Sequence, residues 1–144
     1  MEITKRVDKL VEEFSHLGEW EDRYKYIIDL GKSLEEMDEE FKTEANKVKG
    51  CQSQVWLHAS VKDGKVYFQA DSDASIVKGI VSVLVRIYSD ATPDEILATK
   101  PEFLDTIGLR QHLSMSRANG LSSMIKQISM YAIAFKTKIE MGIN

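Results

Sequence analysis

Apolar residues recur every three or four positions through the first part of the chain, a spacing typical of amphipathic helices. Residues 1–17 and 20–34 each carry such a stripe, separated by charged and polar positions. The pattern stops at the acidic stretch 35–44, for which we expect a solvated loop or a short helical turn. The alternative interpretation of this stretch is a docking surface for a basic partner.

The hydrophobic period changes to two between residues 54 and 70, as in a half-buried strand. Strands are expected over residues 54–61 and 65–70, and Asp63-Gly64 between them is a signal for a hairpin turn. A lone hairpin is only marginally stable, so helices or a further strand must cover it. We expect residues 46–50 to supply part of a third strand.

The pattern is helical again after the hairpin. Asp71-Ser72-Asp73 offers short acceptors and negative charge, which favour a helix start. The helix that follows, to about residue 88, is apolar nearly all round, and this predicts a buried central position. Thr92-Pro93-Asp94-Glu95 predicts a capping box, and Ser114 or Ser116 is expected to start a long final helix.

The order of helices, hairpin and helices predicts an α+β fold, in which a small antiparallel sheet is covered by helices. A length of 144 residues fits a single domain spanning residues 1–144.

Charge and composition exclude several classes of function. The 19 Lys and Arg are scattered among 23 Asp and Glu, so a nucleic-acid interface is not expected. The most apolar stretch, residues 76–87, is interrupted by Lys78 and Arg86 and is too short to cross a bilayer, and the first ten residues lack the apolar core of a signal peptide. A single cysteine suits a reducing compartment, and we expect a cytoplasmic protein.

The sequence offers no metal or cofactor motif. His16, His58 and His112 lie far apart, and one cysteine cannot build a thiolate-rich metal centre. No Gly-rich phosphate loop or cofactor-binding lysine motif is present. We therefore expect neither a metal nor a cofactor in this chain.

The remaining candidate is Cys51. A single cysteine is most often a small buried hydrophobe. The neighbours of Cys51 are a glycine, two polar residues and two lysines: Lys47, Lys49, Gly50, Gln52 and Ser53. Nearby cations lower the pKa of a thiol. From the residues alone, a buried structural cysteine and a reactive thiol both remain open. No second cysteine is present to resolve a disulfide, so a reactive thiol would suit a group-transfer relay.

Residues 48–56, Val-Lys-Gly-Cys-Gln-Ser-Gln-Val-Trp, resemble the signature of the SufE family (SufE- and CsdE-like) of iron–sulfur assembly proteins. Segments 20–31, 71–79 and 113–121 match the same family in the same order, and the likeness spans about residues 3–135. The chain departs from the family pattern after residue 34, where prolines are usual, and at Met115, where a proline is usual.

The resemblance implies a fold like that of the IscU scaffolds and a role as a sulfur acceptor. Cys51 would take sulfur as a persulfide from a cysteine desulfurase of the SufS or CsdA type, a pyridoxal-phosphate enzyme, and pass it to a downstream iron–sulfur scaffold. The activity would be a sulfurtransferase-type relay that works with the desulfurase rather than alone. Two alternatives remain: a peroxide-reactive or redox-sensing thiol, and an allosteric adaptor in which Cys51 is incidental. Monomer and homodimer are both compatible with the sequence.

A persulfide carrier must expose its thiol for attack and shelter it afterwards. The resemblance implies a mobile loop, residues 50–52, that turns inward at rest and outward on the partner. Asp73, Arg117 and Asn119 open two helices, and if these helix ends meet the loop, they would support the thiolate. The alternative is plain capping for Asp73 and Asn119, and a surface ion pair for Arg117.

Overall fold

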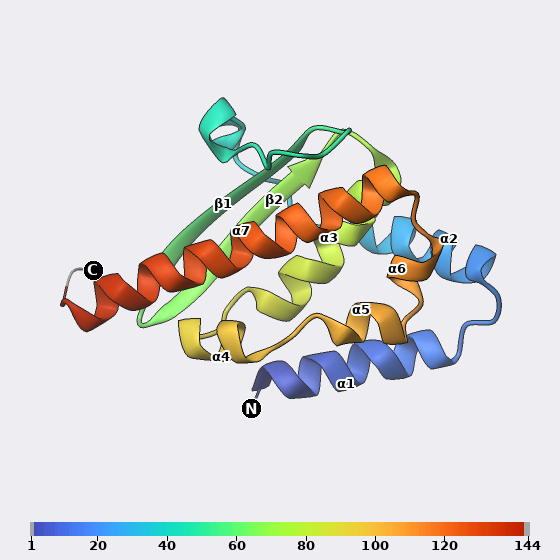
Figure 1. The fold of residues 1–144 in the computed structure, drawn as a ribbon, viewed down its shortest axis with the longest axis horizontal. Coiled ribbons are helices and arrows are strands. Elements are labelled where there is room, and N and C mark those ends of the chain that lie inside the picture. Colours follow the sequence, from blue (N-terminus) through green and yellow to red (C-terminus); the bar gives the residue numbers. More distant parts are fainter. Residues whose placement is uncertain (1, 143–144) are drawn as a thin grey trace.

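Seven α-helices and one β-hairpin make up residues 2–142, the part of the chain described by a computed structural model. The helices and the two 3₁₀ turns, η1 and η2, are arranged around the hairpin as Figure 1 shows. In chain order the elements are α1 (Glu2–Ser15), α2 (Trp20–Lys32), η1 (Glu39–Phe41), η2 (Glu44–Asn46), β1 (Val55–Lys62), β2 (Lys65–Ser72), α3 (Ser75–Tyr88), α4 (Pro93–Ala98), α5 (Glu102–Thr106), α6 (Leu109–His112) and α7 (Met115–Glu140).

The predicted hairpin is present, but the predicted third strand is wrong. β1 and β2 pair antiparallel, with Lys62 opposite Lys65, and both turn residues between them have the positive φ that a two-residue hairpin turn requires. Residues 46–50 contribute only one bridge, in which the Val48 amide donates to the Val55 carbonyl at 2.9 Å. Val48 already faces Val55, the first residue of β1, so further pairing along β1 would fall to the residues before Lys47, and these form the 3₁₀ turn η2 instead.

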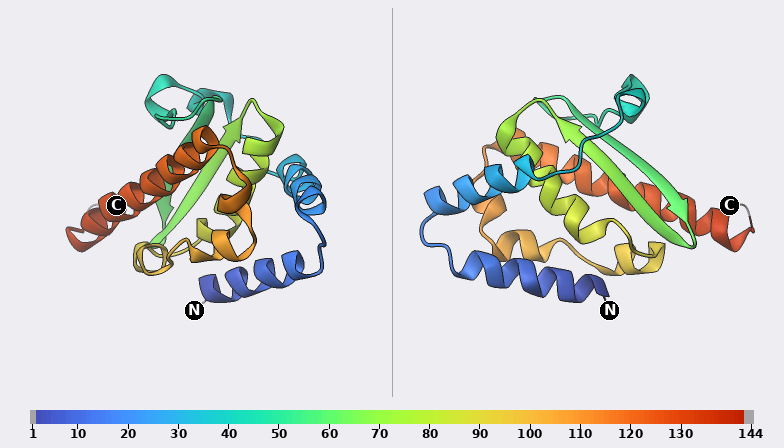
Figure 2. Two further views of the ribbon diagram at one scale, coloured as in Figure 1. Left: turned by 45° about the vertical axis from the view of Figure 1, so that its right-hand side comes forward. Right: turned by 180° about the vertical axis from the view of Figure 1, so that it is seen from behind.

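Helices cover the apolar face of the hairpin. Its inward side chains are all buried: Val55, Leu57, Ala59, Val66, Phe68 and Ala70. The predicted buried helix is α3, which packs on β2 and lies between the hairpin and α2. The long α7 runs beside the hairpin and projects beyond its turn (Figure 1). From the other sides, α1 lies at the edge of the molecule opposite η1 and η2 (Figure 2).

All three predicted helix starts are present, but only two of the predicted caps are formed. Thr92 and Glu95 form the capping box of α4, and the Ser114 hydroxyl accepts from the Arg117 amide at the start of α7. Helix α3, however, begins after Ala74 without any side-chain cap. The Asp71–Asp73 run instead makes contacts with the cysteine loop and with the acidic segment, as described below. No helix within residues 2–142 has the length and apolar character needed to cross a membrane.

Candidate functional site

The cysteine loop, residues 47–54, connects η2 to β1 and lies against α7. At its first end the backbone is held to β1 by the Val48–Val55 hydrogen bond. At Gly50, a Cβ atom would lie 2.9 Å from the Ser123 hydroxyl of α7, and the backbone is left-handed. Both the space and the backbone angle therefore favour glycine at this position, which brings the next residue, Cys51, down onto the helix.

The thiol of Cys51 points toward α7 and is half-buried. Its Sγ lies 3.7 Å from the carbonyl oxygen of Gly120, to which the S–H donates a weak hydrogen bond. A Cβ atom on Gly120 would lie only 3.3 Å from Sγ and 3.7 Å from the Cys51 Cα. Glycine within a helix costs about 1 kcal/mol relative to alanine, and the close approach of Cys51 accounts for its presence here.

A cavity of about 20 Å³ lies beside the thiol. A volume of that size is enough for about one water-sized group. Its walls come from the cysteine loop, from α3 and from the first turns of α7: Cys51, Gln52, Ser53, Val77, Ser116, Arg117, Gly120 and Met124. The cavity therefore has room for about one further atom attached to Sγ, and Cys51 also lines a wider hollow of about 300 Å³ formed by residues 47–55 of the loop.

Burial, rather than charge, sets the protonation of Cys51 in this arrangement. Removal from water raises the pKa of the Cys51 thiol, and this is the sole cause of its shift. The neighbouring lysines do not counteract the shift, because the Lys47 and Lys49 ammonium groups both face the Glu44 carboxylate, at 2.9 and 3.9 Å. We expected these lysines to lower the thiol pKa, and that expectation is wrong for the sheltered conformation.

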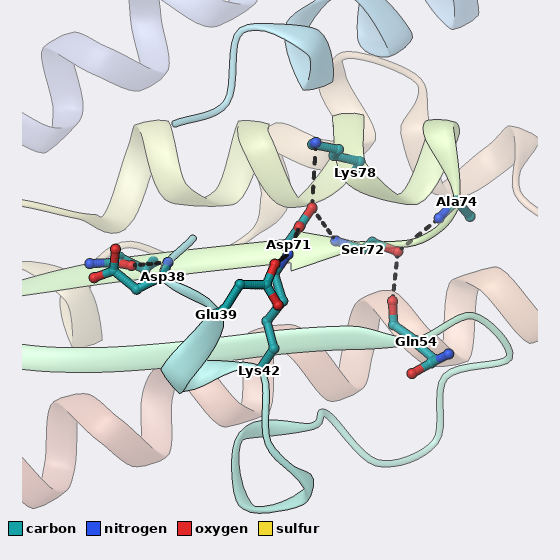
Figure 3. Close-up of polar contacts among 9 residues, drawn as sticks. Asp38, Glu39, Lys42, Gln54, Asp71, Ser72, Ala74 and Lys78 are labelled. Atoms are coloured by element: carbon teal, nitrogen blue, oxygen red, sulfur yellow. Dashed lines mark hydrogen bonds and ion pairs between the residues drawn. The ribbon is translucent and has the colours of Figure 1, made fainter. Parts of the chain in front are cut away.

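The second end of the loop is held by the segment between β2 and α3. The Gln54 amide donates to the Asp73 carboxylate at 3.0 Å, and the Asp73 amide donates back to the Gln54 carbonyl at 3.3 Å. The Ser72 hydroxyl donates to the same carbonyl at 2.8 Å and accepts from the Ala74 amide (Figure 3). Ser72 and Asp73 therefore hold the end of the cysteine loop, although the sequence predicts that they cap the helix.

Asp71 holds the acidic stretch, residues 35–44, against the hairpin. Its carboxylate lies between the ammonium groups of Lys42 at 2.9 Å and Lys78 at 3.5 Å (Figure 3). Burial opposes ionisation of Asp71, but the hydrogen bonds from Lys42 and from the Ser72 amide prevail and hold the pKa of the Asp71 carboxyl below its usual value. Lys42 also lies over the Trp56 ring, 5.9 Å from its centroid. The chain before the loop is thereby fixed, while residues 49–53 form no regular element.

The structure brings together most of the residues that the sequence singled out. Gln52, Ser53 and Arg117 line the cavity beside Cys51. Asp73 reaches the loop through Gln54, and Asn119 is an exposed residue of α7 outside the cavity lining.

Sequence reasoning missed Gly120, Val77 and Met124 in the walls of the cavity. The one available signal was a glycine inside a long predicted helix, which is an unfavourable position without a packing reason. Within residues 2–142, no group of three or more His, Cys, Asp or Glu side chains is placed to hold a metal ion.

Comparison with known proteins gives consistent results. Residues 8–132 match the family described as "SufE: Fe-S metabolism associated domain". An uncharacterized SufE-like protein of Rhizobium meliloti is 47% identical over 133 residues, covering 88% of this chain and 94% of the relative. An uncharacterized SufE-like protein of Synechocystis is 44% identical over 128 residues, covering 89% of this chain and 80% of the relative. A solution structure of a hypothetical protein from Thermus thermophilus has the same fold, with a TM-score of 0.77 at 22% identity, and covers 92% of this chain and 96% of that one.

Proposed function

The chain belongs to the SufE family of domains associated with iron–sulfur metabolism, and from this premise we propose that it is a sulfur acceptor that carries a persulfide on Cys51. The donor is a pyridoxal-phosphate cysteine desulfurase of the SufS or CsdA type, and the receiver is a downstream iron–sulfur scaffold. The observation that supports the proposal most directly is the atom-sized cavity beside a half-buried thiol.

The reaction is a thiol–disulfide-type exchange. The Cys51 thiolate attacks the outer sulfur of the persulfide on the desulfurase cysteine. A new S–S bond forms on Cys51, the S–S bond of the donor breaks, and the donor cysteine leaves as a thiolate. No external oxidant or reductant is consumed. The same exchange, with a thiolate of the scaffold as the attacking group, unloads Cys51.

The sheltered geometry suits storage rather than attack. With its pKa raised by burial and its S–H directed at the Gly120 carbonyl, Cys51 is a protonated and poorly nucleophilic thiol at neutral pH. Attack on the donor therefore requires the loop to move away from α7. The loop is held mainly by the Gln54 contacts at one end and by the Val48 hydrogen bond at the other, so residues 49–53 can turn outward while both ends stay fixed.

Once loaded, the outer sulfur would occupy the cavity beside Sγ, away from oxidants and from competing thiols. Arg117 lines the same cavity but does not shift the pKa of the resting thiol, so its guanidinium would have to turn toward the outer sulfur to offset the negative charge of a persulfide anion. Gln52 and Ser53 would close the solvent side. Asp73 would act through Gln54, by holding the returning loop in place.

The peroxide-sensing alternative fits the site less well. Sensor cysteines are exposed thiols with lowered pKa values. Cys51 is half-buried and the pKa of its thiol is raised.

The decisive experiment is intact-mass measurement after incubation with a cysteine desulfurase and cysteine. We expect one added sulfur on the wild type and none on Cys51→Ser. Stimulation of the desulfurase by both proteins, without added sulfur on either, would instead indicate an adaptor. Modification by hydrogen peroxide alone, without sulfur acceptance, would indicate a redox sensor.

A further inference from the structure

Gly120 of α7 has no side chain, yet its backbone lies directly against the candidate thiol. It is buried, it accepts the S–H of Cys51 through its carbonyl at 3.7 Å, and it forms part of the cavity wall. A Cβ atom here would lie 3.3 Å from Sγ, 3.7 Å from Cα and 3.8 Å from Cβ of Cys51. All three of the nearest atoms therefore belong to one residue of the loop.

Glycine at this position has no backbone reason of its own. Residue 120 lies inside α7, where any L-residue fits the helical angles, and glycine weakens a helix. The flanking α7 positions that face the core carry large apolar side chains, Leu121 and Met124. The missing side chain thus leaves space for Cys51 alone.

We propose that Gly120 is a positioning residue that sets the depth at which Cys51 is stored, and that it keeps open the space for one bound sulfur atom. The sulfur-storage part of this inference rests on the proposed function, whereas the positioning of the reduced thiol does not. Residue 120 lines the cavity of about 20 Å³, and a methyl group there would press directly on Sγ. The thiol sits on a loop without regular structure, so the loop gives way and Cys51 moves outward while α7 stays in place.

The first test alkylates the reduced full-length protein with iodoacetamide, in which the thiolate displaces iodide. Cys51 is the one cysteine of the chain, so the added mass reports on it alone. We expect Gly120→Ala to react about tenfold faster than the wild type and Gly120→Ser faster still, since overpacking favours the displaced loop. The matched control is Ser122→Ala, an exposed position of the same helix where helix propensity also rises, and it should react at the wild-type rate.

Two further measurements separate positioning from a general loss of stability. The melting temperature of Gly120→Ala should equal or exceed that of the wild type, because alanine favours the helix. The pH midpoint of alkylation should fall in Gly120→Ala, because an outward thiol is better solvated, and a purely structural role would not move it. Equal alkylation rates in all four proteins would overturn the proposal. The proposal would also be overturned if the faster alkylation of Gly120→Ala increased with urea concentration in parallel with global unfolding.

The second test loads each protein with inorganic polysulfide, whose sulfur chain is cleaved by the Cys51 thiolate to leave a persulfide and a shorter polysulfide. A small monothiol is then added, and it removes the outer sulfur as its own persulfide. We expect the persulfide of Gly120→Ala to last about tenfold less long than that of the wild type. A wild type that never accepts sulfur from a desulfurase would refute the proposed function, and the alkylation series would still decide the role of Gly120.

Discussion

Two places in this molecule depend on a missing side chain, and they behave differently. Where α2 crosses α3, a Cβ atom on Gly79 would lie 2.2 Å from the Ile27 carbonyl oxygen, and one on Gly31 would lie 2.7 Å from the Gly79 amide. Where the cysteine loop meets α7, a Cβ atom on Gly120 would lie 3.3 Å from Cys51 Sγ. The first contact is between two helix backbones that cannot move apart without disrupting the core. The second is between a helix and a side chain on an irregular loop, so it can open and close.

The difference shows how the fold separates stability from reactivity. The crossing of α2 and α3 belongs to the buried core beneath the hairpin, and it fixes α3 against β2. The loop is placed on that rigid base by its two ends and by Gly120. A site built in this way can move its thiol without moving its scaffold.

The largest expected effect tests the rigid contact. Gly79→Ala should lower the free energy of unfolding by about 3 kcal/mol or more, because the methyl group would overlap backbone atoms on the facing helix. Urea denaturation followed by circular dichroism measures this loss. The comparison variant is Gly120→Ala, for which we expect no loss. If both variants were equally destabilised, the distinction between a rigid and a yielding contact would be wrong.

A smaller effect is expected at the ion pair that joins α1 to α3. The Glu13 carboxylate accepts from the Arg86 guanidinium and, at 2.5 Å, from the Tyr26 hydroxyl. Glu13→Gln should lower the free energy of unfolding by about 1–2 kcal/mol at neutral pH, since both charged groups are partly exposed. Glu12→Gln, on the same helix, is the control that makes the same substitution at an exposed position.

The same pair predicts how stability depends on pH. The hydrogen bond from Arg86 holds the pKa of Glu13 below the ordinary glutamate value, although burial opposes it. The contribution is therefore complete above the ordinary pKa and is lost as the pH falls through the lowered value. The difference in the free energy of unfolding between the wild type and Glu13→Gln should shrink in acid, and at neutral pH Glu13→Gln should leave the rate of Cys51 alkylation unchanged, because the loop controls that rate.

The hairpin, the buried α3 and the starts of α4 and α7 could be predicted from the sequence because each is set by local chemistry or by a regular period. The third strand could not be ruled out, since residues 46–50 do pair once, and only the 3₁₀ turn over Glu44–Asn46 ends the pairing along β1. The Asp73 carboxylate could accept a hydrogen bond from a helix amide or from a loop amide equally well, and in the folded protein it accepts from the Gln54 amide. The role of Gly120 depends on the cysteine loop lying over α7, and the hydrophobic pattern of the sequence does not predict that contact.

Weakening the hydrogen bonds at the Gln54 end of the cysteine loop should change the rate of Cys51 alkylation more than the free energy of unfolding. Asp73→Ala removes the acceptor for the Gln54 amide, and we expect a loss of about 1 kcal/mol or less because both residues are exposed to solvent. Hydrogen exchange at residues 50–54 should speed up, and Cys51 should be alkylated severalfold faster. Glu36→Ala, an exposed acid of the acidic segment, serves as the control and should leave both unchanged. Unaltered exchange in Asp73→Ala would show that the Gln54 contacts do not hold the loop.

The smallest expected effect concerns salt, and it tests what controls the thiol at rest. Burial raises the pKa of Cys51, so its alkylation in the wild type should reach half-maximum above the pH typical of a free thiol and return toward that pH in urea. Charge–charge effects are screened by salt, whereas desolvation is not. The midpoint should therefore stay constant when the ionic strength is raised, and it should also stay constant in Lys47→Gln and Lys49→Gln, whose ammonium groups face Glu44. An upward shift of the midpoint with salt, or in either lysine variant, would mean that these cations stabilise the thiolate at rest. The loop contact with Gly120 would then be a packing feature, and the thiol would be active without leaving α7.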